Sequence, residues 1–258
     1  MISAPVRAVA AYRFANYRRT WKGTMVGTIV NPIMFLLAIG VGLGSLVEEG
    51  TTDTLEGVAY LAFVAPGMLA ATAMFTGVND STYPVLGSVK WHPTTFAQVA
   101  TPITPAQAAL GHLLWNAIRL LMSVGAFFVV MAIAGAPESW WVLAAVPAAI
   151  LTGLAFAAPV QAWAVGLESD ALFPNVQRFV VLPMFLFSGT FFPTEQLPDA
   201  VEPLTVLTPL WHGVELCRSL SLGTATLGGS LVHVVVLGAV TAAGIVASSR
   251  TYERRLTA

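Results

Sequence analysis

Long uncharged stretches separated by short polar segments dominate the hydrophobic pattern of the chain. A bilayer core takes about 20 consecutive apolar residues as a helix, and stretches of that length recur along the sequence. A β-barrel span would alternate apolar and polar residues over about ten positions, whereas residues 33–41 are continuously apolar or glycine. The pattern therefore predicts an all-α integral membrane protein in which residues 1–258 form a single domain. Its six transmembrane helices are expected at about Met25 to Val47, Val58 to Val78, Leu113 to Ala134, Trp140 to Leu167, Val176 to Phe192 and Gly228 to Ala247.

Charge patterning predicts the orientation of these helices, because basic residues accumulate on the cytoplasmic side. Basic side chains cluster before the first predicted span and in the tail 248–258, whereas the loop after the first span carries only acids. With six spans and cytoplasmic N- and C-termini, the charge of every loop fits the side of the membrane on which that loop would lie. The pattern therefore predicts a multi-pass protein of the cytoplasmic membrane. The residues concerned are Arg7, Arg13, Arg18, Arg19, Lys22, Arg250, Arg254 and Arg255 on the inside, and Glu48, Glu49, Asp53 and Glu56 outside.

The amino-acid composition excludes several classes of protein and of binding site. Of the 258 residues, 56% are hydrophobic and only 10% are charged, against roughly 25% charged residues in a soluble domain, so a water-soluble globule is excluded. The net charge of −1 argues against nucleic acid as a partner, because such binding needs a concentrated basic surface. Cys217 is the single cysteine and excludes an internal disulfide. His92 and His212 lack metal-ligand spacing, so no metal site is expected.

Residues 1–23 have the pattern of an amphipathic helix that lies in the inner membrane interface. Arg13 interrupts the apolar side, and we expect its guanidinium to snorkel to the lipid headgroups, which make membrane lipids a partner. The alternative is a disordered basic tail that only sets the topology. The apolar side consists of Val6, Val9, Ala10, Phe14, Tyr17 and Trp21.

The predicted cytoplasmic segment 80–112 is long for a loop, and loops of this length are usually functional or disordered. Its apolar content, which includes Trp91 and Phe96, argues against a solvated linker. A short helix is expected to begin near Thr94, with Thr94 as its cap, and to end before Pro102. The segment either presents a small apolar surface to a cytoplasmic partner or rests on the bilayer.

The predicted outer segment 193–227 contains prolines at spacings of five or six residues, and these break it into short pieces. Many apolar residues lie between the prolines, among them Leu204 and Trp211. The segment is too apolar for a free loop and too interrupted for a span. It is expected to form re-entrant helices that precede the last span.

A polar stripe crosses the start of the third predicted span. His112, Asn116, Arg119 and Ser123 are spaced so that they share one side of a helix. Polar groups inside a span are costly and invite a functional hypothesis. The stripe either lines a substrate path or holds helices together through an ion pair of Arg119 with Asp80, Glu168 or Asp170. The ion pair is favoured, because the stripe does not extend across the bilayer.

The sequence argues against two kinds of catalytic site, an intramembrane serine protease and a P-loop nucleotide site. An intramembrane serine protease would need Ser188 and His233 as nucleophile and base, but Leu186 stands where a Gly-x-Ser-Gly motif has glycine. A P-loop ends in Gly-Lys-Ser/Thr, whereas the two lysines of this chain follow Trp21 and Val89. Any ATP-driven motor must therefore be another polypeptide.

The run FSGTFFPTEQLP at 187–198, followed by Pro209-Leu210 and Arg218, resembles the C-terminal signature of ABC-2 type transporter permeases of the nodulation-protein-J-like branch. The matching positions in this signature are Ser188, Gly189, Phe191, Phe192, Pro193, Glu195, Pro198 and Arg218. Further similarity lies at Asn31-Pro32, in the glycine-rich residues 40–44, at 60–68 and at 101–104, so the resemblance covers most of the chain.

The resemblance implies an ABC-2 transmembrane domain without enzymatic activity or cofactor of its own. The permease would pair with a second copy, expected to form a homodimer, and with two copies of a cytoplasmic ATPase that binds ATP and Mg²⁺. Relatives export lipo-oligosaccharides, polysaccharides, lipids or hydrophobic drugs. Residues 86–101 would then hold the ATPase-coupling helix, although Ser88-Val89-Lys90 lacks the Glu-Arg pair of many relatives. The implied coupling residues are Val89, Lys90, Trp91, His92, Thr94, Phe96, Gln98 and Thr101.

Together these observations predict the permease of an ATP-driven exporter that moves an amphipathic or lipid-like substrate by alternating access. Small residues such as Gly40, Gly42, Gly44 and Gly67 would allow close helix approach. A secondary transporter, which usually needs inverted repeats and ion-coupling groups at the bilayer centre, and a non-transporting scaffold are the alternatives.

Overall fold

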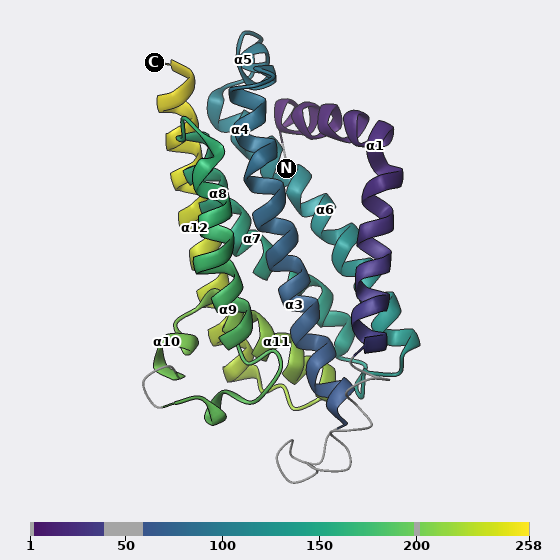
Figure 1. Ribbon diagram of the computed structural model, residues 1–258. Coiled ribbons are helices and arrows are strands. Elements are labelled where there is room, and N and C mark those ends of the chain that lie inside the picture. The colour runs from purple at the N-terminus through teal and green to yellow at the C-terminus, as the bar shows by residue number, and fades with distance from the viewer. Residues whose placement is uncertain (1–2, 39–58, 199–201, 258) are drawn as a thin grey trace.

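The computed structural model describes residues 3–38, 59–198 and 202–257, which form a bundle of long helices (Figure 1). The described residues contain helices and irregular segments and no strand, so the all-α prediction is confirmed there. Shorter helices join the long ones at both ends of the bundle. The long helices are α1 (Ala4–Leu37), α3 (Tyr60–Ser81), α6 (Pro105–Ile133), α7 (Val142–Val165) and α12 (Leu227–Thr257).

Four helical stretches among the described residues are long and apolar enough to cross a membrane. They coincide with the second, third, fourth and sixth predicted spans, and the six-span count itself stays a prediction. The four are Tyr60–Val89, in which α3 continues into α4 (Tyr83–Val89), Pro105–Ile133, Val142–Val165 and Leu227–Thr257.

The first and fifth predicted spans differ from these four. The second half of α1 covers the start of the first span, and residues 39–47 lie outside the described part of the chain, together with Gly40, Gly42 and Gly44. The fifth is an interrupted helix made of η2 (Asp170–Leu172), α8 (Phe173–Val176), the π-helical η3 (Gln177–Val181) and α9 (Leu182–Phe187). Its predicted end at Phe192 is wrong, because Gly189 adopts φ 76° and turns the chain out of the helix.

Two other helix boundaries also differ from the predicted ones. The helix of the third predicted span begins at Pro105 rather than Leu113, because Thr104 and Gln107 form a capping box that satisfies free N–H groups at the helix start. The last helix continues through the predicted tail to Thr257. A T-x-x-Q pattern that precedes an apolar run is a sequence signal for the first of these boundaries.

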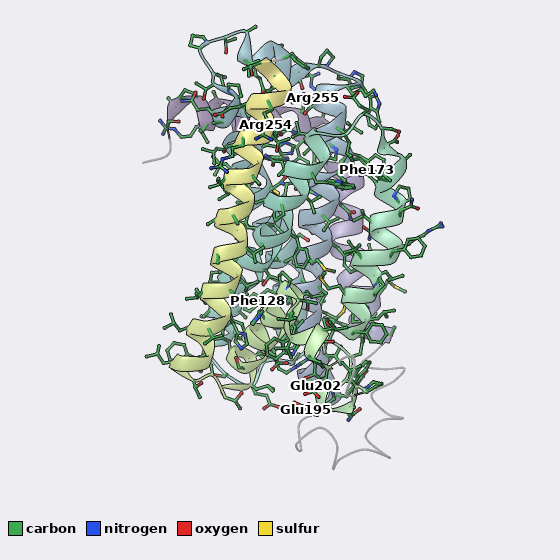
Figure 2. The ribbon with its side chains drawn as sticks, turned by 90° about the vertical axis from the view of Figure 1, so that its left-hand side faces the viewer. Phe128, Phe173, Glu195, Glu202, Arg254 and Arg255 are labelled. Carbon is green, nitrogen blue, oxygen red and sulfur yellow. The ribbon has the colours of Figure 1, made fainter. Side chains whose placement is uncertain are left out.

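The two ends of the bundle carry different elements (Figure 1). The first half of α1 crosses one end, where the end of α12 and the short helices α4 and α5 (Thr94–Val99) also lie, and we call this the terminal end. The opposite end holds α10 (Glu202–Val206), α11 (Pro209–Leu222) and η4 (Thr194–Gln196). Figure 2 shows Arg254 and Arg255 at the terminal end and Glu195 and Glu202 at the opposite end.

Helix α7 lies at the centre of the packing and contacts α3, α11 and α12, while α1 packs on α6. The approach of α3 to α7 depends on two glycines. A Cβ at Gly77 would lie 2.3 Å from the carbonyl oxygen of Gly153, which leaves no room for a side chain. Such close approach through small residues is typical of membrane helices. Helix α3 also packs against α6.

Candidate functional site

The polar stripe predicted on α6 lies against the last residues of α3, and we call these contacts the polar seam. Arg119 donates from Nε to Asp80 Oδ2 at 3.1 Å, and Asn116 donates from Nδ2 to Ser81 Oγ at 2.8 Å. Of the three acids considered as partners of Arg119, Asp80 is therefore the one in contact.

The two ends of the polar seam are bonded as well. The hydroxyls of Ser123 and Thr76 lie 2.9 Å apart, and His112 Nε2 lies 3.3 Å from the backbone oxygen of Asp80. His112 Nδ1 also lies 3.4 Å from the hydroxyl of Tyr252 on α12. Each stripe residue thus has a partner on another helix, and hydrogen bonds of this kind stabilise helix packing in a membrane.

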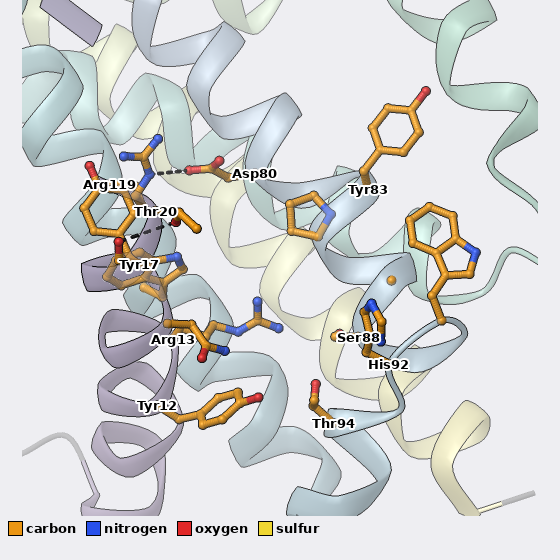
Figure 3. Close-up of a pocket in the computed structure, with 15 residues that line it drawn as sticks. Tyr12, Arg13, Tyr17, Thr20, Asp80, Tyr83, Ser88, His92, Thr94 and Arg119 are labelled. Atoms are coloured by element: carbon orange, nitrogen blue, oxygen red, sulfur yellow. Dashed lines mark hydrogen bonds and ion pairs between the residues drawn. The ribbon is translucent and has the colours of Figure 1, made fainter. Parts of the chain in front are cut away.

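A cavity of about 620 Å³ opens beside the polar seam at the terminal end (Figure 3). The first half of α1 forms one wall, α4 and the start of α5 form another, and α3 and α6 contribute the seam residues. Its lining is aromatic and polar. The residues are Tyr12, Arg13, Asn16, Tyr17, Thr20, Asp80, Tyr83, Pro84, Gly87, Ser88, Trp91, His92, Thr94, Trp115 and Arg119.

Two guanidinium groups and one carboxylate give this cavity its charge. Among the described residues, Arg13 Nε and Arg119 Nη1 are buried and have no hydrogen-bond partner. Arg119 also stacks on Tyr17, with Cζ 4.8 Å from the ring centroid. Arg13 lines this cavity, and its Nε is buried there. The expectation that its guanidinium reaches the lipid headgroups stays a prediction.

Aromatic side chains hold α1 in place against α6. The rings of Tyr17 and Phe14 pack on Trp115, with centroids 5.5 and 6.2 Å away. The sequence indicated an apolar side for α1, but it gave no sign that Tyr12, Tyr83 and Trp115 would share one cavity. The alternative of a disordered basic tail does not hold for α1, which is helical from Ala4.

The predicted coupling segment 86–101 contains the end of α4, the turn 90–93 and helix α5. Helix α5 begins at Thr94 as expected, but Pro93 occupies the N-cap position, so Thr94 is not the cap. Val89 is buried in a small core with Leu86 and Phe173. The other coupling residues are on or near the surface: Lys90, Trp91, His92, Phe96 and Thr101 are exposed, and Thr94 and Gln98 are half-buried.

An exposed ionic cluster ties this segment to the end of α12. Glu168 accepts a bond from Arg255, and its Oε2 lies 3.8 Å from Nζ of Lys90. The hydrogen bond and charge of Arg255, followed by the charge of Lys90, lower the pKa of the Glu168 carboxyl. The cluster joins α4, the loop after α7 and α12 at the surface.

At the opposite end, Arg218 of the predicted signature is buried, and all three guanidinium nitrogens are bonded. Nε donates to the backbone oxygen of Phe63 at 3.2 Å, Nη1 to Glu215 Oε1 at 2.6 Å and Nη2 to the oxygen of Gly189 at 2.5 Å. Its Cζ lies 3.8 Å from the ring centroid of Phe63. Arg218 therefore ties α11 to α3 and to the turn after α9.

The other signature residues shape that turn. A Cβ at Gly67 would lie 3.2 Å from Cα of Thr190, so Gly67 lets the turn approach α3. Phe191 packs on Phe185 with ring centroids 5.0 Å apart. In the next residues, Phe192 is half-buried, Pro193 precedes η4, Glu195 is exposed, and Pro198 accepts a backbone bond from Glu202.

The structure gives the two candidate protease residues different partners. Ser188 donates to the backbone oxygen of Phe185 at 3.0 Å and lies 2.8 Å from the Thr190 hydroxyl. His233 lies 2.8 Å from Nδ1 of His212. Within the described residues, Ser188 and His233 make no nucleophile–base contact with each other.

Comparison with known proteins agrees with these observations. Residues 5–222 match the family model described as ABC-2 type transporter. The chain is 31% identical to nodulation protein J of Rhizobium meliloti over 88% of this chain and 83% of the relative, and 28% identical to that of Rhizobium leguminosarum bv. viciae over 96% and 94%. It is 24% identical to a probable doxorubicin resistance ABC transporter permease protein of Mycobacterium tuberculosis, over 79% of this chain and 72% of the relative. With the match extending over most of its length, the chain belongs to the ABC-2 type transporter family.

Proposed function

We propose that this chain is the permease subunit of an ATP-driven exporter in the cytoplasmic membrane. The observation that carries the proposal is the family match over residues 5–222, together with four helices able to span a membrane. The second half of α1 and the interrupted helix α8–α9 would complete six spans. Both basic termini would then face the cytoplasm, as the excess of basic residues near the chain ends favours.

The energy source in this proposal is a separate ATPase that binds ATP and Mg²⁺. The turn between α4 and α5 supports this arrangement, because Trp91 and Phe96 are 49% and 40% exposed at the terminal end. Val89 and Leu86 anchor the turn in a small core. A motion imposed on the exposed aromatics by the partner would therefore pass to α4 and then to α3, with which α4 is continuous.

The proposed substrate is amphipathic or lipid-like, such as a glycolipid, a lipo-oligosaccharide or a hydrophobic drug. Relatives named for nodulation and for doxorubicin resistance are consistent with a substrate of this class. Transport would proceed by alternating access between two permease copies, each joined to one of two ATPase copies. The polar seam would then keep α3 and α6 together while the facing helices of the two copies rearrange.

Co-purification with the ATPase from a neighbouring reading frame tests this proposal. We expect a complex whose ATP hydrolysis rises when lipids or drugs of the right class are added. Phe96→Glu should reduce capture of the ATPase, whereas Leu204→Glu, which places the same charge on an exposed residue at the opposite end, should not. Transport by the chain alone under an ion gradient would instead indicate a secondary transporter, and absence of both transport and ATPase capture would indicate a scaffold.

A further inference from the structure

The cavity beside the polar seam has more positive charge than its own carboxylate neutralises. Arg13 and Arg119 both line it, and Asp80 is the acid in its lining. Asp80 bonds Nε of Arg119, while Arg119 Nη1 and Arg13 Nε have no partner among the described residues. A buried donor without a partner is costly, so the cavity favours an acceptor beyond those that the described residues supply.

The two free donors are presented from different elements. Figure 3 shows the Arg13 guanidinium extending from α1 toward Ser88 and His92, while the Arg119 guanidinium lies beside Asp80 and above Tyr17. The Ser88 hydroxyl is not available as an acceptor for Arg13, because it already donates to the Val85 oxygen and accepts from Thr95. An anion in the cavity would therefore be held by planar guanidinium groups. A guanidinium group can donate two parallel hydrogen bonds to two oxygens of one phosphate.

The surroundings of the cavity match a membrane surface. Tyr12, Tyr83 and Trp91 are exposed aromatics on its rim, and Tyr and Trp are enriched at the headgroup level of a bilayer. The first half of α1, which forms one wall, has the amphipathic pattern of an interfacial helix. The volume of about 620 Å³ exceeds what a single phosphate group fills and leaves room for the glycerol part of a headgroup.

We propose that this cavity binds the phosphate of an anionic lipid headgroup in the inner leaflet, with Arg13 and Arg119 as its ligands. The lipid is a resident of the permease rather than its cargo. It bridges α1 to the α4 side of the bundle and so steadies the wall behind the exposed turn at Trp91. The proposal requires that the terminal end lies at the membrane surface, and it does not require ATP-driven export.

Lipid binding to the purified full-length permease in a neutral detergent tests the proposal without the ATPase. Phosphatidylglycerol should raise the thermal unfolding midpoint, whereas diacylglycerol with the same acyl chains, which has no phosphate, should not. Arg13→Gln and Arg119→Gln should each weaken the apparent lipid affinity by about tenfold, because each removes a charge-assisted donor. Arg18→Gln is the matched control, since Arg18 is an exposed arginine of the same helix that does not line the cavity.

The possible results separate a built site from general attraction to a basic helix. If Arg18→Gln weakens binding as much as Arg13→Gln, or if diacylglycerol stabilises equally, the proposal is wrong. Glycerol phosphate is a further arm: equal protection by this soluble ester, with the same dependence on Arg13, would keep the phosphate site and reject a lipid as its source. Should Arg13→Gln not fold, Arg13→Lys and Arg119→Lys keep the charge and lose the planar pairing, and unchanged affinity in both would overturn the assignment. Failure of ATPase capture would leave all of these measurements unaffected.

Discussion

Arg218, which is buried, and Arg119, which is half-buried, lie at opposite ends of the same bundle and differ in how many of their nitrogens are bonded. Each of the three nitrogens of Arg218 has a protein acceptor, and Phe63 covers one face of its guanidinium. Arg119 bonds Asp80 through Nε, while its Nη1 has no partner within the described part of the chain. Both arginines contact an aromatic ring and an acid, so composition alone does not distinguish them.

The difference lies in the acceptors that each fold region supplies. Two of the three Arg218 acceptors are backbone oxygens, one of Gly189 in the turn after α9 and one of Phe63 in the first turn of α3. Within the described residues, the acceptor bonded to Arg119 is instead a side-chain oxygen, Oδ2 of Asp80. A fully bonded arginine stabilises the fold, whereas one with a free donor in a cavity can also receive a ligand.

The strongest test of this comparison is Arg218→Met. The substitution leaves the oxygens of Phe63 and Gly189 without their donor, and a buried acceptor without a partner costs about 1–3 kcal/mol. We expect a loss of about 3 kcal/mol in the free energy of unfolding, measured by denaturant titration in detergent. Arg250→Met, at an exposed position of α12, should change it little. Equal stability of the two variants would show that the bonds of Arg218 contribute nothing.

The bonds of Arg218 depend on residues that are distant in the sequence. Its place in a family signature was recognised, but the backbone oxygens that bind it come from residues more than a hundred positions away and from a turn made by Gly189. Long apolar stretches were sufficient to place four spanning helices, because hydrophobicity depends on local composition. The cavity was missed because Arg13 and Tyr83 meet only through tertiary packing, which the helical period of either segment does not encode.

A smaller effect is expected from the Arg119–Asp80 pair, and a double-mutant cycle measures it. Asp80→Asn and Arg119→Gln should each cost about 1–2 kcal/mol, because the pair is mostly buried but already has one unbonded nitrogen. The double variant should be more stable than the sum of the single losses predicts, since neither partner is then left charged and alone. Additive losses would show that the two side chains do not interact, and Arg119 would lose its role in the polar seam.

The smallest effect is expected at the exposed cluster of Lys90, Glu168 and Arg255, which contrasts with the less exposed contacts of Arg218 and Arg119. Arg255, and then Lys90, lower the pKa of the Glu168 carboxyl in the folded chain. A group with a lowered folded-state pKa stabilises the fold above its unfolded value and loses that contribution as the pH falls through the folded value. The difference in unfolding midpoint between the wild type and Glu168→Gln should therefore be present at neutral pH and disappear in acid, below the ordinary range of a glutamate.

The same difference in unfolding midpoint should also depend on the salt concentration. Glu168 has a side chain that is 70% exposed, so added salt should screen its contribution at neutral pH. The buried contacts of Arg218 should respond far less, because their partners are removed from solvent. Glu202→Gln, at the opposite end of the bundle, is the control for a change of net charge alone. A Glu168→Gln effect that persists in acid and in high salt would have to come from packing. In that case the contrast between this exposed ionic cluster and the buried, fully bonded Arg218 would not hold.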